Sequence, residues 1–546
     1  MRAVTLRGIA IGVFGVSAAL ASLPGVAQQV TPGTVQDTLK PPPELERPAK
    51  RDAVDEPERF VPRPPPSDRT LIVERFEFGG NALYSSRELA ALVAGYLGRP
   101  VTLLEIYDAA DKVANFYVRQ GYTLASVTVP AQRVADGVVR LEVVEGRYGM
   151  VRVDGASSYD ADTVRRHLGD IPFGSPYKAG ELQGGMRRLN RLPGLSAKAV
   201  LRPGETYGTS DVVVKVTETP VSGSFVVDNY GRENIGEFRV AASATFNNPT
   251  GVADQLQLLA LRSEDGRLNY GYGAYSLPLN LRGDRLVLSH GYASFEVPEN
   301  NVDGSNRASR IQVDMPIIAN ERTRFRISPA ISRTDSTVDL FGVSTGLGTE
   351  LTLFELGALY NRSHDNLAVT QVNAEISSNF DTATLTDRNN QRFKLELGAQ
   401  HLHPLKSHTF GFVRIHGVFS DDPLPDTERF SIGGPTSVRG YPASEARGDK
   451  GIFGTVGLRQ VYRLGSTRLQ GRLYADSGRA WLVGLPPGAD DEFSLSSIGI
   501  GLDATMPGPV SLKLDYAVPT DGESSTRTVS DGKEDGRLFG SLTVGF

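Results

Sequence analysis

The pattern of hydrophobic and polar positions divides the chain into two regions of different texture. From Leu71 to Val216, stretches that alternate with a period of two are interleaved with stretches whose apolar residues recur every three or four positions. From about Ser222 to Phe546 the helical period disappears, and segments of about 9 to 13 residues alternate in polarity between clusters of Gly, Asn, Asp and Pro. The first region predicts small α+β units, and the second predicts an all-β structure.

The first α+β unit is predicted over residues 69–146. A strand over 71–78 precedes two capping boxes, at 85–88 and 102–105, each of which starts an amphipathic helix. Strands over 123–129 and 138–144 complete the order β-α-α-β-β.

The same order repeats over residues 147–219. The predicted elements are a strand over 149–153, helices over 161–168 and 179–192, and strands over 196–201 and 211–216. Two such units in succession resemble POTRA domains, periplasmic modules that capture clients by adding an extended strand to a sheet edge. Two unrelated small α+β domains are the alternative that the pattern leaves open.

The all-β region, residues 220–546, holds about sixteen candidate strands, which at about 20 residues per strand with its connection suits a transmembrane β-barrel. A soluble β-sandwich or propeller is the competing architecture. The last strand ends at the aromatic Phe546, which resembles the assembly signal of outer-membrane barrels. An even number of strands places both ends of the barrel on one side, the side of the α+β units.

The beginning of the chain predicts export. A basic start, an apolar run over 9–20 and small residues at 25–27 form a signal peptide over residues 1–27, since the apolar run is shorter than the roughly 20 residues of a spanning helix. Residues 28–68 are rich in proline and charge and predict a linker that could hold a short helix near 35–39.

Composition and motifs limit which ligands and reactions the chain could support. A net charge of -5 without a basic face argues against nucleic acid as a partner, and the absence of cysteine excludes disulfides and thiolate chemistry. We find no catalytic constellation, no phosphate-binding loop and no cofactor or metal motif. His401 and His403 share a strand face at a spacing that could bind metal, but ordinary lumen or surface histidines are the favoured interpretation.

One charged residue stands out in the β-rich region. The glycine-rich connection at about 420–450 holds Val438, Arg439, Gly440 and Tyr441, and counting strands makes it the sixth external loop. A guanidinium cannot deprotonate, so a loop folded into the barrel lumen must provide Arg439 with a carboxylate or water. A solvent-exposed loop is the alternative.

A partner for this arginine is predicted on the strand that follows. Tyr474, Asp476 and Gly478 lie two residues apart and therefore share one face, which we expect to be the lumen face. Asp476 can accept a bidentate pair from Arg439, and Gly478 leaves space for the loop.

Together these motifs resemble the TpsB outer-membrane transporters of two-partner secretion, the haemolysin and filamentous-haemagglutinin exporters of the POTRA-barrel superfamily. Further matching stretches lie at 187–194, 201–204, 208–211 and 246–251, with Asp254 after them. The resemblance covers essentially the whole mature chain. One departure concerns the N-terminal helix that often plugs the pore in this family, because the segment here offers only a short candidate interrupted by proline.

The resemblance implies an outer-membrane barrel with periplasmic POTRA domains that exports an unfolded TpsA-type exoprotein, expected to be β-helical, without ATP. It also implies porin activity, haemolysin-type activation or secretion, contact with outer-membrane lipid, delivery by periplasmic chaperones and the barrel-assembly machinery, and a monomer. For client capture we favour the edge strand and neighbouring helix of the first unit. The Arg439–Asp476 pair is predicted to act as a latch, with a purely bracing role as the alternative.

Three other functions compete. A barrel-assembly factor of the same superfamily would share the loop and the barrel, but the two POTRA-like units are fewer than assembly machinery carries. An outer-membrane enzyme would need a catalytic site, and a simple porin would need no periplasmic modules.

Overall fold

The computed structural model describes residues 30–39, 54–56, 63–320, 322–344, 348–383, 392–485, 491–523 and 536–546. The expected signal peptide, residues 1–27, and most of the expected linker lie outside the described residues. Within the described part of the chain, no helix is both long and apolar enough to cross a membrane.

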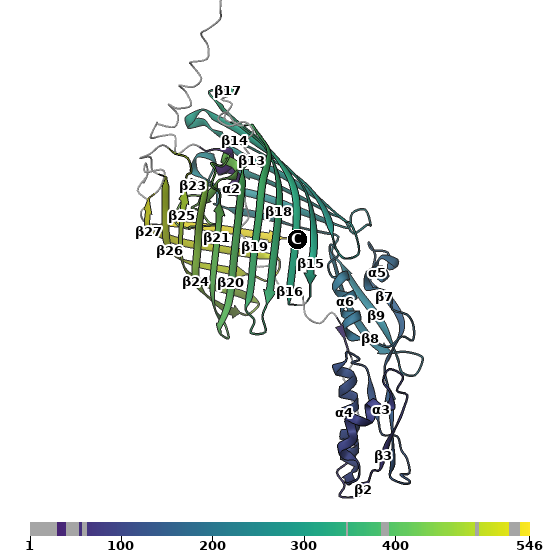
Figure 1. Cartoon of the computed structure of the whole chain (residues 1–546). Helices are drawn as coiled ribbons and strands as arrows, with labels where there is room; N and C mark the ends of the chain where they lie inside the picture. The colour runs from purple at the N-terminus through teal and green to yellow at the C-terminus, as the bar shows by residue number, and fades with distance from the viewer. Residues whose placement is uncertain are drawn as a thin grey trace, which may run out of the picture.

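The first α+β unit lies farthest from the barrel (Figure 1). Both predicted capping boxes form, with the hydroxyls of Ser85 and Thr102 accepting from the N–H groups of Glu88 and Glu105. The elements are β2 (Thr70–Ile72), β3 (Arg75–Gly79), α3 (Ser86–Val93), η2 (Ala94–Tyr96), β4 (Pro100–Thr102), α4 (Leu103–Arg119), β5 (Ser126–Thr128) and β6 (Val138–Val144).

The strand expected over 71–78 is in fact two strands, β2 and β3, in different sheets. The strand is interrupted at Val73 and Glu74 because their backbone groups form hydrogen bonds with turn residues and not with a neighbouring strand. The carbonyl of Val73 accepts from the N–H of Gly98, and the N–H of Glu74 donates to the carbonyl of Gly137. The main sheet has the order β3-β6-β5, with β3 parallel to β6.

The second α+β unit lies between the first unit and the barrel (Figure 1). Its elements are β7 (Arg147–Asp154), α5 (Ala161–Leu168), α6 (Ala179–Leu189), β8 (Leu195–Pro203) and β9 (Thr209–Glu218). Both helices pack on one face of the sheet around a core that includes Leu182, Met186 and Leu189. A strand from the expected linker, β1 (Val54–Asp55), adds to the edge, giving the order β1-β8-β9-β7.

The remaining strands form a closed antiparallel barrel in which β28 pairs with β10. Sixteen strands of the described chain span it, and β17 (Val343–Ser344) adds only to β16 in an external loop. The spanning strands are β10 (Val221–Asp228), β11 (Arg239–Asn247), β12 (Gln255–Ser263), β13 (Leu268–Pro278), β14 (Arg285–Val297), β15 (Val302–Ala319), β16 (Thr323–Leu340), β18 (Thr349–Ser363), β19 (Val369–Ala383), β20 (Phe393–Lys406), β21 (Thr409–Phe419), β24 (Lys450–Leu464), β25 (Thr467–Trp481), β26 (Glu492–Thr505), β27 (Val510–Glu523) and β28 (Arg537–Gly545).

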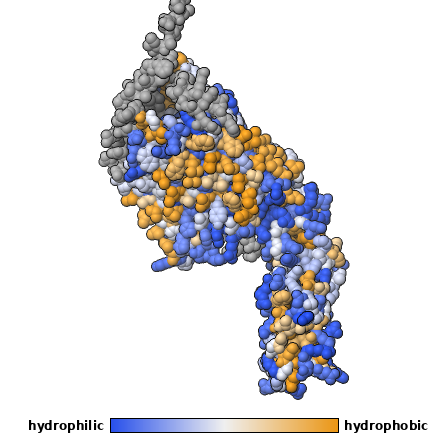
Figure 2. All heavy atoms as spheres, in the orientation of Figure 1, coloured by the Kyte–Doolittle hydropathy of each residue, from blue (hydrophilic) through white to orange (hydrophobic). Residues whose placement is uncertain are grey.

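The outward face of the barrel is apolar over a band visible in Figure 2. Ile311, Ile331 and Phe354 are register neighbours on β15, β16 and β18, and all three are exposed. Several strands exceed the expected 9 to 13 residues, with 18 residues in each of β15 and β16. The extra length bears charged residues on the outward face, such as Arg333 and Asp335, because these strands continue beyond the apolar band.

The sixth external loop joins β21 to β24 and folds back inside the barrel. It contains η5 (Asp426–Glu428), β22 (Phe430–Ile432) and β23 (Ala446–Gly448), and the two short strands pair with each other. Apolar loop residues pack against the inner barrel wall in a cluster formed by Val418, Leu424, Phe430, Ile432, Val438, Ala446, Phe453, Ala480 and Leu495. Two further turns of 3-10 helix, η3 (Glu233–Ile235) and η4 (Pro298–Asn300), lie in other external loops.

A helix from the N-terminal segment also lies inside the barrel. α2 (Pro32–Leu39) contacts β14, β15, β16 and η5. It begins three residues before the candidate expected at 35–39, because Pro32 occupies the first helical position, where a missing N–H is no loss. Val30 and Val35 are buried against Ile235, Leu268 and Phe295 of the barrel.

Candidate translocation pore and its inner loop

Glycines shape the inner loop. Gly433, Gly434 and Gly440 all adopt positive φ, a region that residues with a Cβ rarely enter. A Cβ on Gly440 would also lie 3.1 Å from the carbonyl oxygen of Ala517 on β27. The tip of the loop therefore approaches the barrel wall closely enough to bring Arg439 onto it.

Arg439 meets the carboxylate that the sequence suggested. Its Nη2 lies 2.7 Å from Oδ1 of Asp476, and its Nε donates to Oδ2 at 2.7 Å. The backbone N–H of Arg439 donates to the same Oδ2 at 3.1 Å. Both residues are buried, with 7% of Arg439 and 2% of Asp476 exposed. This bidentate geometry, which also engages the backbone, fixes both the orientation of the guanidinium and the position of the loop.

Two further groups surround the guanidinium. Its central carbon lies 3.3 Å from the ring centroid of Tyr474, a cation–π contact, and Nη1 lies 3.4 Å from Oδ1 of Asp515 on β27. Asp515 also pairs with Arg472 at 3.1 Å, and Arg472 pairs with Asp503 at 2.8 Å. Arg439 thus belongs to a charge network across β25, β26 and β27.

Sequence reasoning missed Asp515. The available signal was the alternation of β27, which places Asp515 on the lumen face together with Lys513 and Ala517. That signal shows which way Asp515 points, but not that the loop would reach it.

The other predicted residues pack the loop onto the wall. A Cβ on Gly478 would lie 2.9 Å from Cβ of Phe453 and about 3 Å from methyl groups of Ile432 and Val438, so only glycine fits there. Val438 is fully buried, and the hydroxyl of Tyr441 donates to the carbonyl of Ser496 at 3.1 Å.

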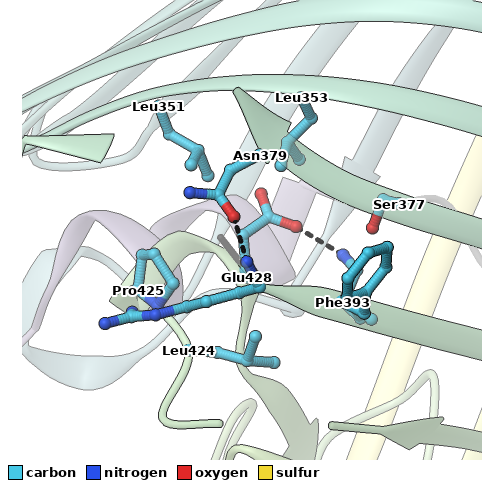
Figure 3. A pocket seen from close by; sticks show the side chains of 10 residues that line it. Leu351, Leu353, Ser377, Asn379, Phe393, Leu424, Pro425 and Glu428 are labelled. Carbon is cyan, nitrogen blue, oxygen red and sulfur yellow. Dashed lines mark hydrogen bonds and ion pairs between the residues drawn. The ribbon is translucent and has the colours of Figure 1, made fainter. Parts of the chain in front are cut away.

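A second ion pair attaches the loop to another part of the wall. Glu428 of η5 binds the ammonium of Lys394 on β20, and both side chains are nearly buried. Figure 3 shows Glu428 between Asn379 and Phe393, with Leu424 and Pro425 of the loop beside it. The loop is therefore attached to β20 as well as to β25 and β27.

The inner helix and the inner loop are joined by charge. Nε of Arg447 lies 3.3 Å from Oδ2 of Asp37 in α2, and Arg447 also pairs with Asp426. Asp426 in turn accepts from the N–H of Gly33 at 2.8 Å. On the barrel wall, Arg239 donates to the carbonyl of Thr38 at 2.7 Å. These bonds hold α2 inside the lumen against the loop.

The second α+β unit is bonded to the periplasmic turns of the barrel. Arg191 donates to the carbonyls of Arg282, at 3.2 Å, and Ala319, at 2.9 Å. Asn248 of the barrel donates to the carbonyl of Ser158 at 2.9 Å. The matching stretches around 187–194 and 246–251 thus both contribute bonds to this junction.

The same junction contains a carboxylate with a low pKa. Burial raises the pKa of Glu218, but hydrogen bonds from the backbone N–H groups of Ser158 and Ser157 outweigh it and bring the pKa to about 2. Glu218 therefore remains ionised at any ordinary pH and fixes the 157–159 segment that Asn248 contacts.

The remaining candidates lie away from the lumen. Phe546 packs its ring on Phe225 of β10, with centroids 5.7 Å apart, and its backbone exchanges hydrogen bonds with Gly223. His401 and His403 stack at 5.7 Å on β20, on the face that carries the exposed Leu397 and Leu405. That face points outward, so these histidines do not line the pore.

A closed barrel with a loop folded into its lumen and two α+β units on its periplasmic side defines a class of outer-membrane transporter. The first unit, residues 71–146, matches the POTRA domain of ShlB type. Residues 208–504 match the family described as haemolysin secretion/activation protein ShlB/FhaC/HecB. Because this match covers more than half of the 546 residues, the chain belongs to that family.

Individual relatives agree with this assignment. The chain is 24% identical over 467 residues to the heme/hemopexin transporter protein HuxB of Haemophilus influenzae, covering 80% of each protein. It is 26% identical over 477 residues to the hemolysin transporter protein ShlB of Serratia marcescens, covering 82% of each.

Solved structures share the fold. CdiB from Escherichia coli matches with a TM-score of 0.66 at 20% identity, covering 99% of this chain and 100% of that one. BamA from Haemophilus ducreyi, lacking POTRA domains 1–3, matches with a TM-score of 0.57 at 15% identity, covering 88% of this chain and 100% of that one. The chain is an outer-membrane transporter of two-partner secretion, with its POTRA region in the periplasm.

Proposed function

We propose that the chain exports one TpsA-type exoprotein, unfolded, through the lumen of its barrel. The observation that carries the proposal is that the lumen is occupied by two segments, α2 and the inner loop, held by side-chain bonds to the barrel and to each other. A segment that is bonded to the wall without being part of it can leave, and its departure would open a path for an extended polypeptide.

The partner is a secreted protein, as it is for the family. The names of relatives specify heme/hemopexin and hemolysin as what those proteins transport. We expect a β-helical exoprotein whose folding outside the cell removes it from the translocation equilibrium and so drives export without ATP.

Several finer assignments belong to the same proposal. Residues 1–27 act as a signal peptide, residues 147–219 as a second POTRA domain and residues 220–546 as the barrel. Phe546 serves the barrel-assembly machinery as a terminal signal, periplasmic chaperones deliver both proteins, and the transporter works as a monomer embedded in outer-membrane lipid. We propose no enzymatic activity and no cofactor.

The inner loop acts as a latch in this account. Opening must separate Arg439 from Asp476, and removal of one partner from a buried pair typically costs about 3 to 5 kcal/mol. The bonds therefore keep the resting pore shut and give way only when a partner occupies the transporter.

The test is export of the neighbouring secreted protein. The probe is the product of an adjacent reading frame that encodes a large protein with its own signal peptide, expressed with and without this chain. We expect the probe to reach the medium only when the chain is present, with the other outer-membrane proteins at normal abundance. A general loss of outer-membrane barrels in its absence would instead favour the assembly factor.

A further inference from the structure

The outward face of the barrel is hollowed over four neighbouring strands, β11 to β14. The hollow measures about 530 Å³, which lies in the range of sites that bind small ligands. Its lining includes Val240 and Tyr292, whose side chains are exposed. Arg239, the neighbour of Val240 in the chain, points the other way and bonds to α2 in the lumen. The hollow therefore faces the lipid and not the pore.

Small residues form the floor of the hollow. Ala242, Ala260 and Gly271 are register neighbours on β11, β12 and β13, and Tyr292 of β14 is the next residue in the same row. A Cβ added to Gly271 would meet nothing within 4 Å. The space above this floor can therefore accept an apolar chain without any movement of the wall.

The hollow lies at the external end of the barrel. Arg262, which lines it, is the last residue but one of β12, and the turn that follows is external. A Cβ on Gly266 would lie 2.6 Å from Nη2 of Arg262, so the guanidinium lies over that turn. Two register rows closer to the periplasm, the same outward face carries Leu256 and Leu288. A ligand in the hollow would thus hold its charged part outward and its apolar part towards the membrane interior.

A second cation stands beside the first. The guanidinium carbon of Arg307 on β15 lies 5.4 Å from the ring centroid of Tyr292, a cation–π contact. Its register neighbour Asp335 is paired with Arg333 at 3.1 Å. Within the described part of the chain, neither Arg262 nor Arg307 forms an ion pair with a carboxylate. An apolar hollow with two such guanidinium groups at its outer end is complementary to a phosphorylated lipid.

We propose that this hollow, with Arg262 and Arg307, is a binding site for lipid A, the phosphorylated and multiply acylated glycolipid of the outer leaflet. An acyl chain would lie over Ala260 and Gly271, and the guanidinium groups would bind phosphate, which suits their planar donor geometry. A phospholipid of the inner leaflet fits less well, because its headgroup lies at the opposite end of the barrel.

The proposed site is separate from the translocation path. Leu261 and Tyr270 contribute to the lining of the hollow and also pack against the inner cluster that holds Val35 of α2. The lipid and the inner helix would therefore lie on opposite sides of the same wall. Lipid binding needs no exported partner, so it can be measured whether or not the proposed function holds.

The test measures retention of added lipid by the purified full-length transporter in detergent, by native mass spectrometry. The probes are bisphosphorylated lipid A and, for comparison, phosphatidylglycerol. One variant, Arg262→Gln with Arg307→Gln, removes both charges, and a second, Gly271→Leu, fills the hollow. Arg333→Gln is the control for charge, because Arg333 already has a carboxylate partner. Gly471→Leu is the control for bulk, because a Cβ there also meets nothing within 4 Å.

We expect the unmodified chain and both controls to retain a single molecule of lipid A. Affinity should fall about tenfold for each guanidinium removed, and Gly271→Leu should lose the lipid. Equal retention by all five proteins would overturn the proposal, and phosphatidylglycerol binding as tightly as lipid A would overturn the assignment to the glycolipid. Heat-modifiable mobility checks that each barrel is folded, and if one variant does not fold, the other decides.

Discussion

The guanidinium of Arg439 is a permanent charge buried inside a membrane protein. Arg439 is surrounded by Asp476, Asp515 and the face of Tyr474, so its burial is compensated from three directions. The arrangement also makes a simple exchange of Arg439 and Asp476 uninformative, because an aspartate at position 439 would face Asp515. Single removals with matched controls are therefore the sharper tests.

Replacing Arg439 with Ala should abolish most export while leaving the barrel inserted, because the loop then loses the fixed position on the wall from which an arriving partner is expected to release it. The unpaired, buried Asp476 costs about 3 to 5 kcal/mol. The matched control is Arg479→Ala on β25, the strand that carries Asp476. The pair of Arg479 with Glu492 is exposed, so its loss should cost less than about 1 kcal/mol. Export is measured alongside heat-modifiable mobility, which reports barrel folding. Normal export from Arg439→Ala at normal surface abundance would rule out the latch, and a barrel that fails to fold would favour the bracing role.

A bulky residue at Gly478 should dislodge the loop without touching any charge. Gly478→Val collides with Phe453, Ile432 and Val438, so the loop should lie farther from the wall and the pore should open more often in planar bilayers. Gly471→Val is the control, since nothing lies within 4 Å of a Cβ at that position of the same strand. Identical opening frequencies in the two variants would show that the loop does not close the pore.

Residue-level prediction from the sequence succeeded where the signal was local. Alternation on β25 was enough to place Tyr474, Asp476 and Gly478 on one face. Asp515 was missed because its contact with Arg439 spans 76 positions and depends on where a loop lands inside a closed barrel.

At the scale of elements, the inner helix is defined by tertiary contacts more than by its own sequence. α2 has eight residues, fewer than the roughly 12 to 15 that make an isolated helix even marginal in water, so its bonds to the barrel and loop must stabilise it. The starts of α3 and α4 were predictable because each carries a capping box in its own sequence. The extent of α2 and the existence of β1 were not predictable, because both depend on tertiary contacts. Neither of the latter carries a local signal.

Removing Arg447 should loosen the inner helix. Arg447→Ala breaks the contacts with both Asp37 and Asp426, so α2 should leave the lumen more often and the frequency of large channel openings should rise. Arg333→Ala, on the outward face of β16, serves as the control. Unchanged channel behaviour in Arg447→Ala would mean that the helix does not obstruct the pore or is held by other bonds alone.

At the scale of the whole molecule, capture and transport must be aligned across the junction between the second unit and the barrel. Arg191 bonds to two periplasmic turns, and Asn248 reaches back to Ser158. These contacts join the second unit to the periplasmic end of the barrel. The order of domains was predictable from texture alone, but this junction was not, because its polar contacts link turns that no periodic pattern describes.

Loss of Arg191 should loosen this junction and lower export. Spin labels on cysteines introduced at Tyr207 and Ser466, one in the second unit and one in a barrel turn, would report the distance between the two bodies. We expect a broader distance distribution in Arg191→Ala than in Arg152→Ala, an exposed control in the same unit. A distribution of unchanged width would show that the junction is fixed by other contacts.

The most direct test of passive export is reconstitution. Purified transporter is inserted into lipid vesicles, and the unfolded exoprotein encoded beside it is added without nucleotide, with its passage scored by protection from protease. We predict that the exoprotein is protected in vesicles carrying the unmodified chain and remains digestible in vesicles carrying Arg439→Ala. No protection with the unmodified chain, or protection that depends on added ATP, would contradict the account.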